Sequence, residues 1–533
     1  MKLREFFSNF FAGVKNGISR YFIAFICTVL LFLTASFEIL WETGADDVII
    51  PLCMAFGLTA LFSVLLKSVQ EYLFEKLSIL IQAIVCTLAA ILGFILIYVN
   101  YDSLYTAMAY TGIMIALVCF IFFVLMRDEH RESVFAKLIA ASVFSSAVCS
   151  VLSGGLSTCI GAFQALLFNF DNIHKVYFIV LLFVWTIAYP NIFLSFIPKK
   201  DTPASQSKIF KTFVLYAGLP LYILLIAILL VYLAKIVITW HMPVGEINWF
   251  ASFASLFFIF FVLSVMQYPE KLPKLFVKYG GYCLIPVLIM QAIAVFERIN
   301  AYGLTTPRTI SLVLIVIGIL FIGATIIKPK HINKIALVAG IIVLVVTITP
   351  FNVIDMPVAS QTAILKDALV KNDMIKDGMV VPKNDVSKED AETIDSAYHY
   401  LKYNAQQVPD FIPKGEHSFE IIFGFERYND TKSTYQYCYF KTKDSIDISG
   451  YNQMIQVNDY QDKVTFEHNG KTYELNLCDI AQELYNQHGE SQENLEPYKI
   501  DDNVSICFSS LSADLENELV YSTYFKGFAL IKN

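Results

Sequence analysis

Residues 213–233 read FVLYAGLPLYILLIAILLVYL and contain no charged side chain. A helix of about 20 such residues crosses the roughly 30 Å of hydrocarbon in a membrane. Similar runs recur through the first 350 of the 533 residues, for example from Tyr21 to Leu40. Only 16% of all residues are charged, against about 25% in ordinary soluble domains. The sequence therefore predicts a polytopic membrane protein and excludes a single soluble core.

The apolar runs predict about eleven spans, which together form a transmembrane helical bundle over residues 20–350. We expect these spans at residues 20–40, 48–66, 78–99, 104–126, 134–160, 175–197, 210–239, 249–268, 279–297, 308–327 and 332–350. The stretch from Val134 to Phe170 is longer than one span needs, so a second half-span or a re-entrant segment there stays open.

Residues 1–19 precede the first span and mix apolar and basic side chains at helical spacing. The apolar set is Phe7, Phe10, Phe11, Val14 and Ile18, and the basic set is Lys2, Arg4 and Lys15, with Arg20 just beyond. This pattern predicts an interfacial amphipathic helix. We reject a cleaved signal peptide, because the next apolar run exceeds the about 7 to 15 residues of a signal core and no small-residue cleavage site follows.

Basic residues in the connections set the expected orientation, since Lys and Arg accumulate on the cytoplasmic side. The N-terminus and the connections of the same parity hold 19 of them: Lys2, Arg4, Lys15, Arg20, Lys67, Lys76, Arg127, Arg131, Lys137, Lys199, Lys200, Lys208, Lys211, Lys271, Lys274, Lys278, Lys328, Lys330 and Lys334. The opposite parity holds Lys175, Lys235, Arg298 and Arg308. We therefore expect a cytoplasmic N-terminus and, after eleven spans, an extracytoplasmic tail.

The tail, residues 351–533, differs in character from the bundle. It carries a net charge of −14, whereas residues 1–350 carry +7. Helical patterns occupy 360–372, 387–404 and 478–488, and alternating patterns predict strands near 417–424, 434–441, 453–458, 503–509 and 520–531. The clearest element is a hairpin turning at Asn469 and Gly470, a pair that tolerates the positive φ angles of a type I′ turn. The tail is predicted to be an extracytoplasmic α+β domain.

Composition also narrows the partners and cofactors. An acidic tail without a basic patch argues against nucleic acid. The eight histidines form no cluster and the cysteines form no CxxC pair, so we expect no metal and no cofactor. The tail cysteines Cys438, Cys478 and Cys507 allow at most one disulfide, and the sequence does not decide whether it forms.

Two arginines at the ends of neighbouring spans form the candidate site. Gly303 can end one helix, and Thr306 with Pro307 can start the next. Arg298 and Arg308 then stand at the outer face against the charge rule, and Arg308 also lies at the positive end of a helix dipole. We expect Arg298, Tyr302 and Arg308 to bind an anionic group, with Glu297 nearby. The alternative is that both arginines reach lipid phosphates or pair with an acid, such as Glu297 or one in the tail.

The chain resembles a family of bacterial membrane proteins grouped as domain of unknown function 4153. The resemblance rests on Thr239-Trp240 with Pro243 and Gly245, Arg298-Ile299 with Tyr302 to Thr305 and Arg308, Pro350-Phe351 with Ser360-Gln361, and Asp447 to Tyr451. It covers roughly residues 130–533 and adds Trp240 as a supporting site residue. Family members often have a basic residue where this chain has Ile364. The resemblance implies a many-span bundle with an outer domain and no established activity.

No catalytic residue is predicted, and we favour a non-enzymatic role. In this interpretation a protein of the cell envelope presents its outer domain for binding or as a scaffold, with membrane lipids, an envelope lipid or polymer, or another envelope protein as partner. A transporter or lipid translocator is the first alternative. The second is a membrane glycosyltransferase using a lipid-linked donor, because such enzymes place an acid in the first outer loop, where this chain has Asp46 and Asp47. The sequence identifies neither a substrate nor an oligomeric state.

Overall fold

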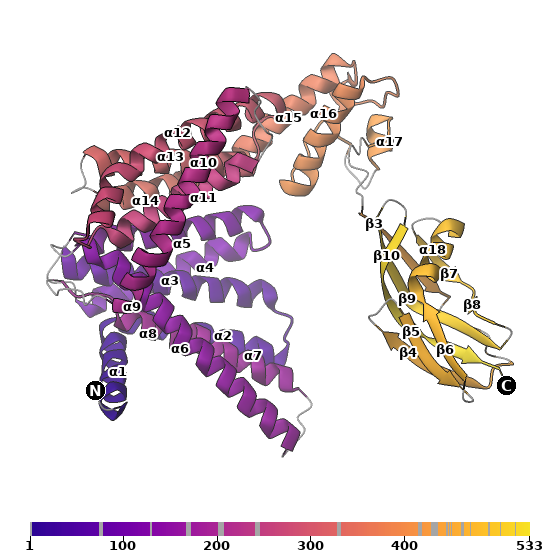
Figure 1. Cartoon of the computed structure of the whole chain (residues 1–533), viewed down its shortest axis with the longest axis horizontal. Coiled ribbons are helices and arrows are strands. Elements are labelled where there is room, and N and C mark those ends of the chain that lie inside the picture. Colours follow the sequence, from indigo (N-terminus) through magenta and orange to yellow (C-terminus); the bar gives the residue numbers. More distant parts are fainter. Residues whose placement is uncertain are drawn as a thin grey trace. The chain divides into compact units, whose positions relative to one another are not determined.

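The computed structural model divides the chain into two compact units, residues 1–423 and 424–533 (Figure 1). The structure describes residues 3–73, 78–127, 131–166, 172–200, 207–239, 246–327, 332–413, 418–427, 435–443, 446, 448, 450–459, 463–468, 471–488, 491–501, 503–516 and 519–532. The first unit is almost entirely helical, and the second is built on a β-sheet.

The first unit contains the predicted bundle. Within the described residues, ten helical segments are long and apolar enough to cross a membrane, and the apolar helix α14 adds an eleventh of 17 residues. They are α2 (Phe22–Trp41), α3 (Asp46–Tyr72), α4 (Ile79–Val99), α5 (Leu104–Leu125), α6 (Arg131–Leu166), α7 with α8 (Ile173–Phe183, Tyr189–Ser195), α9 with α10 (Lys208–Phe213, Leu219–Thr239), α11 (Glu246–Val265), α12 (Lys271–Tyr302), α13 (Thr306–Ile327) and α14 (Ile332–Ile348). The prediction of a multi-pass helical membrane protein is confirmed.

The N-terminal segment forms helix α1 (Leu3–Arg20), as its periodicity predicts. Phe10 and Val14 pack against a small core around Cys149, Val184 and Ile192. A Cβ on Gly17 would lie 2.7 Å from the Cα of Ser195, so glycine permits the backbones of α1 and α8 to touch. Helix α1 is thus packed on the bundle, and its place at the membrane interface stays a prediction.

Two spans contain a wider π-helical turn that the apolar pattern does not reveal. These turns are η1 (Val184–Ala188), between α7 and α8, and η2 (Val214–Gly218), between α9 and α10. Each is followed by a proline, Pro190 or Pro220. Proline has no N–H and its ring crowds the carbonyl one turn back. A π-turn inserts an extra residue there, which lets the helix continue past the ring.

Polar contacts between helices define two ends of the bundle. At one end, called the basic end here, Arg20 before α2 contacts Glu71 in the last turn of α3 and the backbone after α8. At the other, called the tail end, Lys175 in α7 pairs with Glu42 after α2, and Tyr105 in α5 donates to Asp355 at the start of α15. Each contact joins ends of the same parity, as alternating spans require.

Buried polar side chains help to hold the later spans together. Gln291 of α12 is fully buried and donates to Ser252 Oγ of α11 at 2.8 Å and to Asn248 Oδ1 at 3.0 Å. Asn248 in turn donates to Ser311 Oγ of α13 at 2.9 Å. Such interhelical hydrogen bonds contribute roughly 0.6–2 kcal/mol within a membrane. They join helices α11, α12 and α13.

The segment after the last span stays with the first unit. It comprises α15 (Asp355–Lys371), the two-stranded β1 (Ile375–Lys376) and β2 (Met379–Val380), α16 (Lys388–His399), the π-turn η4 (Tyr400–Asn404) and α17 (Phe419–Phe423). Its buried side chains include Leu365, Leu369, Ile394, Leu401 and Phe423. The expected strand near 417–424 is wrong, since its described part is a short helix in which Phe419 and Phe423 pack against Tyr398.

The second unit is a mainly antiparallel sheet with one helix. The strand order is β4 (Gln453–Asp459), β10 (Leu519–Ile531), β9 (Val504–Glu516), β3 (Tyr435–Thr442) and β7 (Ser491–Leu495), with β8 (Tyr498–Lys499) paired to β9. Only β3 and β7 run parallel among the described strands. Four of the five predicted strands are confirmed, and Phe440, Phe508 and Leu511 are buried between the sheet and α18 (Leu477–His488).

The predicted hairpin is confirmed as β5 (Lys463–His468) and β6 (Lys471–Asn476). Its antiparallel register runs from Lys463 opposite Asn476 to His468 opposite Lys471. Val464, Phe466, Tyr473 and Leu475 alternate with polar residues along it, and Phe466 stacks on Tyr473 at 5.2 Å between ring centroids. The expected turn residues, Asn469 and Gly470, lie outside the described residues.

Candidate functional site

The predicted site lies where α12 ends and α13 begins, at the tail end. Gly303 has φ +72° and ψ −179° and caps α12, which ends at Tyr302. Helix α13 starts at Thr306. The turn between them, residues 303–305, therefore leaves backbone groups that neither helix satisfies.

Helix α15 supplies partners for those groups. Ser360 Oγ accepts a hydrogen bond from Leu304 N at 3.0 Å. The Gln361 amide donates to the carbonyl oxygens of Tyr302 and Leu304, both at 2.9 Å. Two adjacent side chains of α15 thus bind three backbone groups of the turn. We call this set of contacts the α15 clamp.

The clamp also explains the glycine and the isoleucine that faces it. A Cβ on Gly303 would lie 2.8 Å from Gln361 Nε2 and closer still to Ile364 Cδ1. Ile364 therefore packs directly over the turn. The close approach and the unusual backbone angles both require glycine at this position.

A second set of contacts fixes the start of α13. Thr306 Oγ1 donates to the carbonyl of Val353 at 2.8 Å, and its backbone N–H donates to Tyr400 Oη at 3.1 Å. Asn352 caps the nearby start of α15, accepting from the backbone N–H groups of Ile354 and Asp355 at 2.8 and 2.6 Å. The turn is therefore held from several directions and forms a rigid support.

Arg308 and Tyr302 meet at this support. Arg308 Nη1 donates to the carbonyls of Tyr302 and Gly303, and its guanidinium lies 5.8 Å from the centroid of the Tyr302 ring. The Tyr302 side chain is otherwise open, with 61% of the residue surface exposed. The geometry brings these two predicted site residues together and leaves the outer side of the ring and guanidinium accessible.

Arg298 adds a second positive charge beside Arg308. It is half-buried near the end of α12, close enough to act electrostatically on Arg308. Among the described residues no carboxylate forms an ion pair with either arginine; exposed Glu297 does not reach them. Trp240 lies outside the described residues. The site thus holds two positive charges and one aromatic ring, and anion binding there stays a prediction.

The acids of the first tail-end loop have structural partners. Asp46 and Asp47 occupy the first turn of α3, where the helix dipole stabilises a carboxylate. Glu42 pairs with Lys175 at 2.8 Å, and this hydrogen bond lowers the pKa of Glu42. These contacts explain the acidic residues without a sugar donor.

Groups suited to catalysis or metal binding are sparse in the described part of the chain. No cluster of three His, Cys, Asp or Glu side chains there could hold a metal ion. The thiols of Cys438 and Cys507 are free and buried, and burial raises the pKa of each to about 11. A thiol with such a pKa stays protonated at neutral pH and is a poor nucleophile.

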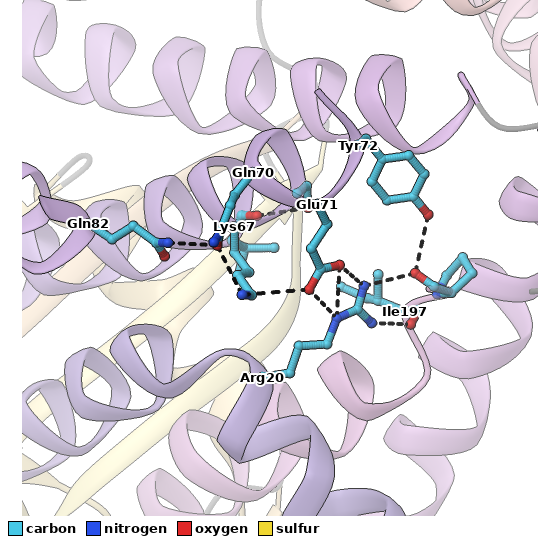
Figure 2. Close-up of polar contacts among 10 residues, drawn as sticks. Arg20, Lys67, Gln70, Glu71, Tyr72, Gln82 and Ile197 are labelled. Carbon is cyan, nitrogen blue, oxygen red and sulfur yellow. Dashed lines mark hydrogen bonds and ion pairs between the residues drawn. The ribbon is translucent and has the colours of Figure 1, made fainter. Parts of the chain in front are cut away.

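A buried ion pair at the basic end was not foreseen from the sequence. Figure 2 shows the Arg20 guanidinium directed at the Glu71 carboxylate, with Nε at 3.0 and 3.2 Å from its two oxygens. Its Nη1 and Nη2 also donate to the carbonyls of Ile197 at 2.7 Å and Pro198 at 3.0 Å. Only 10% of the Arg20 side chain and 22% of the Glu71 side chain are exposed.

Neighbouring side chains extend this cluster toward α4. Lys67 lies 3.8 Å from the Glu71 carboxylate and donates to Gln70 Oε1 at 3.0 Å. Gln82 of α4 donates to the same Gln70 oxygen at 2.6 Å (Figure 2). The cluster joins α1, α3, α4 and the end of α8, which makes it a structural junction. In the sequence Glu71 is one of several acids in the basic connections, and this does not identify its partner.

The α15 clamp predicts that Gly303→Ala lowers the thermal stability of the purified protein. The new methyl group would collide with the clamp, and alanine rarely adopts the required backbone angles, so we expect a loss of about 1–3 kcal/mol. Thermal unfolding in detergent measures the change. Gly93→Ala is the matched control, because nothing lies within 4 Å of a Cβ there. An unchanged unfolding midpoint for Gly303→Ala would contradict the clamp.

The basic-end junction predicts a strong coupling between Arg20 and Glu71. Lysine cannot reach the carboxylate and two carbonyls together, so Arg20→Lys should destabilise the protein by roughly 1–3 kcal/mol. A double-mutant cycle with Glu71→Gln, read by thermal unfolding, measures the interaction itself. Strictly additive effects of the two substitutions would show that the pair contributes nothing.

Comparison with known proteins identifies the family. No curated protein and no solved structure matches the chain. The family model described as "Domain of unknown function (DUF4153)" matches residues 22–372, more than half of the chain. The match begins nearer the N-terminus than the expected residue 130 and ends just after α15, so it includes helices α2 to α15 and the clamp but neither α1 nor the β-sheet unit. The chain belongs to this DUF4153 family.

Proposed function

We propose that this protein is a non-enzymatic component of a bacterial cell envelope, with a cytoplasmic N-terminus and an extracytoplasmic tail. The distribution of basic residues supports this orientation: the connections at the basic end carry 19 Lys and Arg, and those at the tail end carry four. In this arrangement the β-sheet unit is presented outside the membrane. Few of the described side chains are suited to catalysis or metal binding, and this supports a binding role over an enzymatic one.

We further propose that Arg298, Tyr302 and Arg308 bind an anionic group at the outer face. The observation that carries this is the contact of the Arg308 guanidinium with the Tyr302 ring and with backbone carbonyls of the clamped turn; neither Arg308 nor nearby Arg298 forms an ion pair among the described residues. Charges held at such a place are stabilised when an anion joins them. A phosphate or carboxylate fits, because guanidinium groups bind both through paired hydrogen bonds.

A lipid translocator remains the second candidate, and one observation favours it. A hollow of about 580 Å³ runs between the α5–α14 pair and helices α11 and α13. It reaches from Val353 and Met108 at the tail end to Met126 and Ile332 at the basic end. Its lining is apolar apart from Thr111 and Thr347, which suits a lipid chain.

The orientation predicts which introduced cysteines an impermeant thiol reagent can reach on intact cells. Lys200 and Asn384 are both exposed and lie on opposite sides of the membrane in the proposed topology. In a background without the ten native cysteines, Asn384→Cys should be labelled in intact cells, whereas Lys200→Cys should be labelled only after permeabilisation. Labelling of Lys200→Cys in intact cells would show that the orientation is opposite to the proposed one.

The anion site predicts that arginine is needed at both positions. Dihexanoyl phosphatidic acid offers the phosphate without long chains, and its affinity can be measured by titration of the purified protein. We expect Arg298→Lys with Arg308→Lys to weaken binding by about tenfold. Arg127→Lys is the control, because this exposed arginine stacks on Phe123 at the basic end. Wild-type affinity in the double variant would refute the site.

A further inference from the structure

A hollow of about 620 Å³ opens at the basic end between α11, α12 and α13. It is lined by the cationic and aromatic residues Lys274, Lys278, Tyr268 and Tyr282, and by apolar residues such as Val277 and Ile326. The hollow thus has a charged mouth and an apolar wall. This division matches a molecule with a charged head and an apolar chain.

The lengths of the helices place the charged mouth at the level of lipid headgroups. Helix α12 has 32 residues, about 48 Å at 1.5 Å per residue, which exceeds the roughly 30 Å of hydrocarbon. Helix α13 has 22 residues, about 33 Å, which suffices for one crossing. Thr325 and Ile326, near the end of α13, line the same hollow and mark the edge of the apolar layer. The first two turns of α12, which carry Lys274 and Lys278, therefore extend beyond that layer.

The two lysines are available to an anion. They lie one turn apart on α12, and neither forms an ion pair within the described residues. The nearby carboxylate, Glu270, is bonded to Lys211, and that hydrogen bond lowers the pKa of Glu270. The Lys278 ammonium lies 4.9 Å from the centroid of the Tyr279 ring. Aromatic rings and lysines together are typical of the membrane interface.

A groove follows the same helix pair beside the hollow. The groove has a volume of about 680 Å³ and shares Ile326 with the hollow. From there it follows α12 from Ile285 to Asn300, and it is lined almost entirely by apolar side chains. At Gly323 nothing lies within 4 Å of the position of a Cβ, so this glycine leaves the groove open.

We propose that this continuous surface binds one anionic glycerophospholipid. The lipid phosphate lies between Lys274 and Lys278, and an acyl chain lies in the groove past Gly323. Two lysines that form no ion pair among the described residues favour a headgroup with net negative charge over a zwitterionic one, whose ammonium they repel. The apolar groove favours a lipid over a soluble phosphate, because only a lipid buries hydrocarbon there.

The test compares lipids and matched variants of the full-length protein in detergent. The probes are dioleoyl phosphatidylglycerol, dioleoyl phosphatidylcholine and inorganic phosphate, with binding followed by native mass spectrometry and thermal stabilisation. Lys274→Ser with Lys278→Ser removes the charges, and Lys208→Ser with Lys334→Ser removes two exposed lysines of the same end that do not line the hollow. Gly323→Leu fills the groove, and Gly93→Leu adds the same bulk where space is open on α4.

We expect phosphatidylglycerol to bind and stabilise the wild-type protein more than phosphatidylcholine. Loss of Lys274 and Lys278 should weaken phosphatidylglycerol binding by about tenfold or more, and Gly323→Leu should also weaken it, while both controls keep wild-type affinity. Equal effects of the two lipids, equal stabilisation by inorganic phosphate, or unchanged affinity in the lysine variant would overturn the proposal. Unchanged affinity in Gly323→Leu would overturn the placement of the acyl chain.

Discussion

The hydrogen bonds from Ser360 and Gln361 to the α12–α13 turn hold the tail-end structure together. Helix ends leave N–H and C=O groups unsatisfied, and near a membrane few water molecules replace the missing partners. Here the groups of Tyr302 and Leu304 bond to one turn of α15. The same contacts hold α15 against the bundle. The hydrogen bonds that satisfy the backbone of the turn therefore also place the tail-end helices. Gly303 is required because no side chain fits between the turn and α15.

Charge pairing follows the two ends of the bundle. Glu42 pairs with Lys175 at the tail end, whereas Arg20 pairs with Glu71, and Lys211 with Glu270, at the basic end. Burying a charge is costly unless a partner satisfies it. Arg20, whose side chain is mostly buried, is accordingly surrounded by hydrogen-bond acceptors. Arg308 differs, because its contacts among the described residues are with carbonyl oxygens and an aromatic ring, and neither it nor Arg298 forms an ion pair there. This difference separates a structural arginine from one suited to an external anion.

The sequence predicted the parts of the fold that depend on local patterns. Apolar length located the spans, and the Asn-Gly pair located the hairpin of β5 and β6, because both signals act within a few residues. The sequence-based prediction failed for the strand expected near 417–424. The described residues there form the short helix α17, in which Phe419 and Phe423 pack against Tyr398. The π-turns at Val184 and Val214 were also missed, since proline marks a disturbance in a helix without specifying its form.

For the candidate site, the sequence located Arg298, Tyr302 and Arg308 but not what surrounds them. Ser360 and Gln361 were noted only as part of a family pattern, because their contacts join residues more than fifty positions apart. The pairing of Arg20 with Glu71 across 51 positions was invisible for the same reason. Long-range contacts depend on tertiary packing, which one sequence without an alignment does not reveal.

The two proposed anion sites lie at opposite ends of the same helix pair, and the groove between them is apolar. A phosphate moving along the groove would lose its hydration without gaining hydrogen bonds, which costs far more than an acyl chain gains by burial. The groove is therefore suited to hold a chain rather than to pass a headgroup. The hollow between α5, α14, α11 and α13 has the same apolar character. The groove therefore favours a protein that binds lipids in place. The apolar hollow would suit the acyl chain of a translocated lipid, but a translocator would also need a polar path for the headgroup.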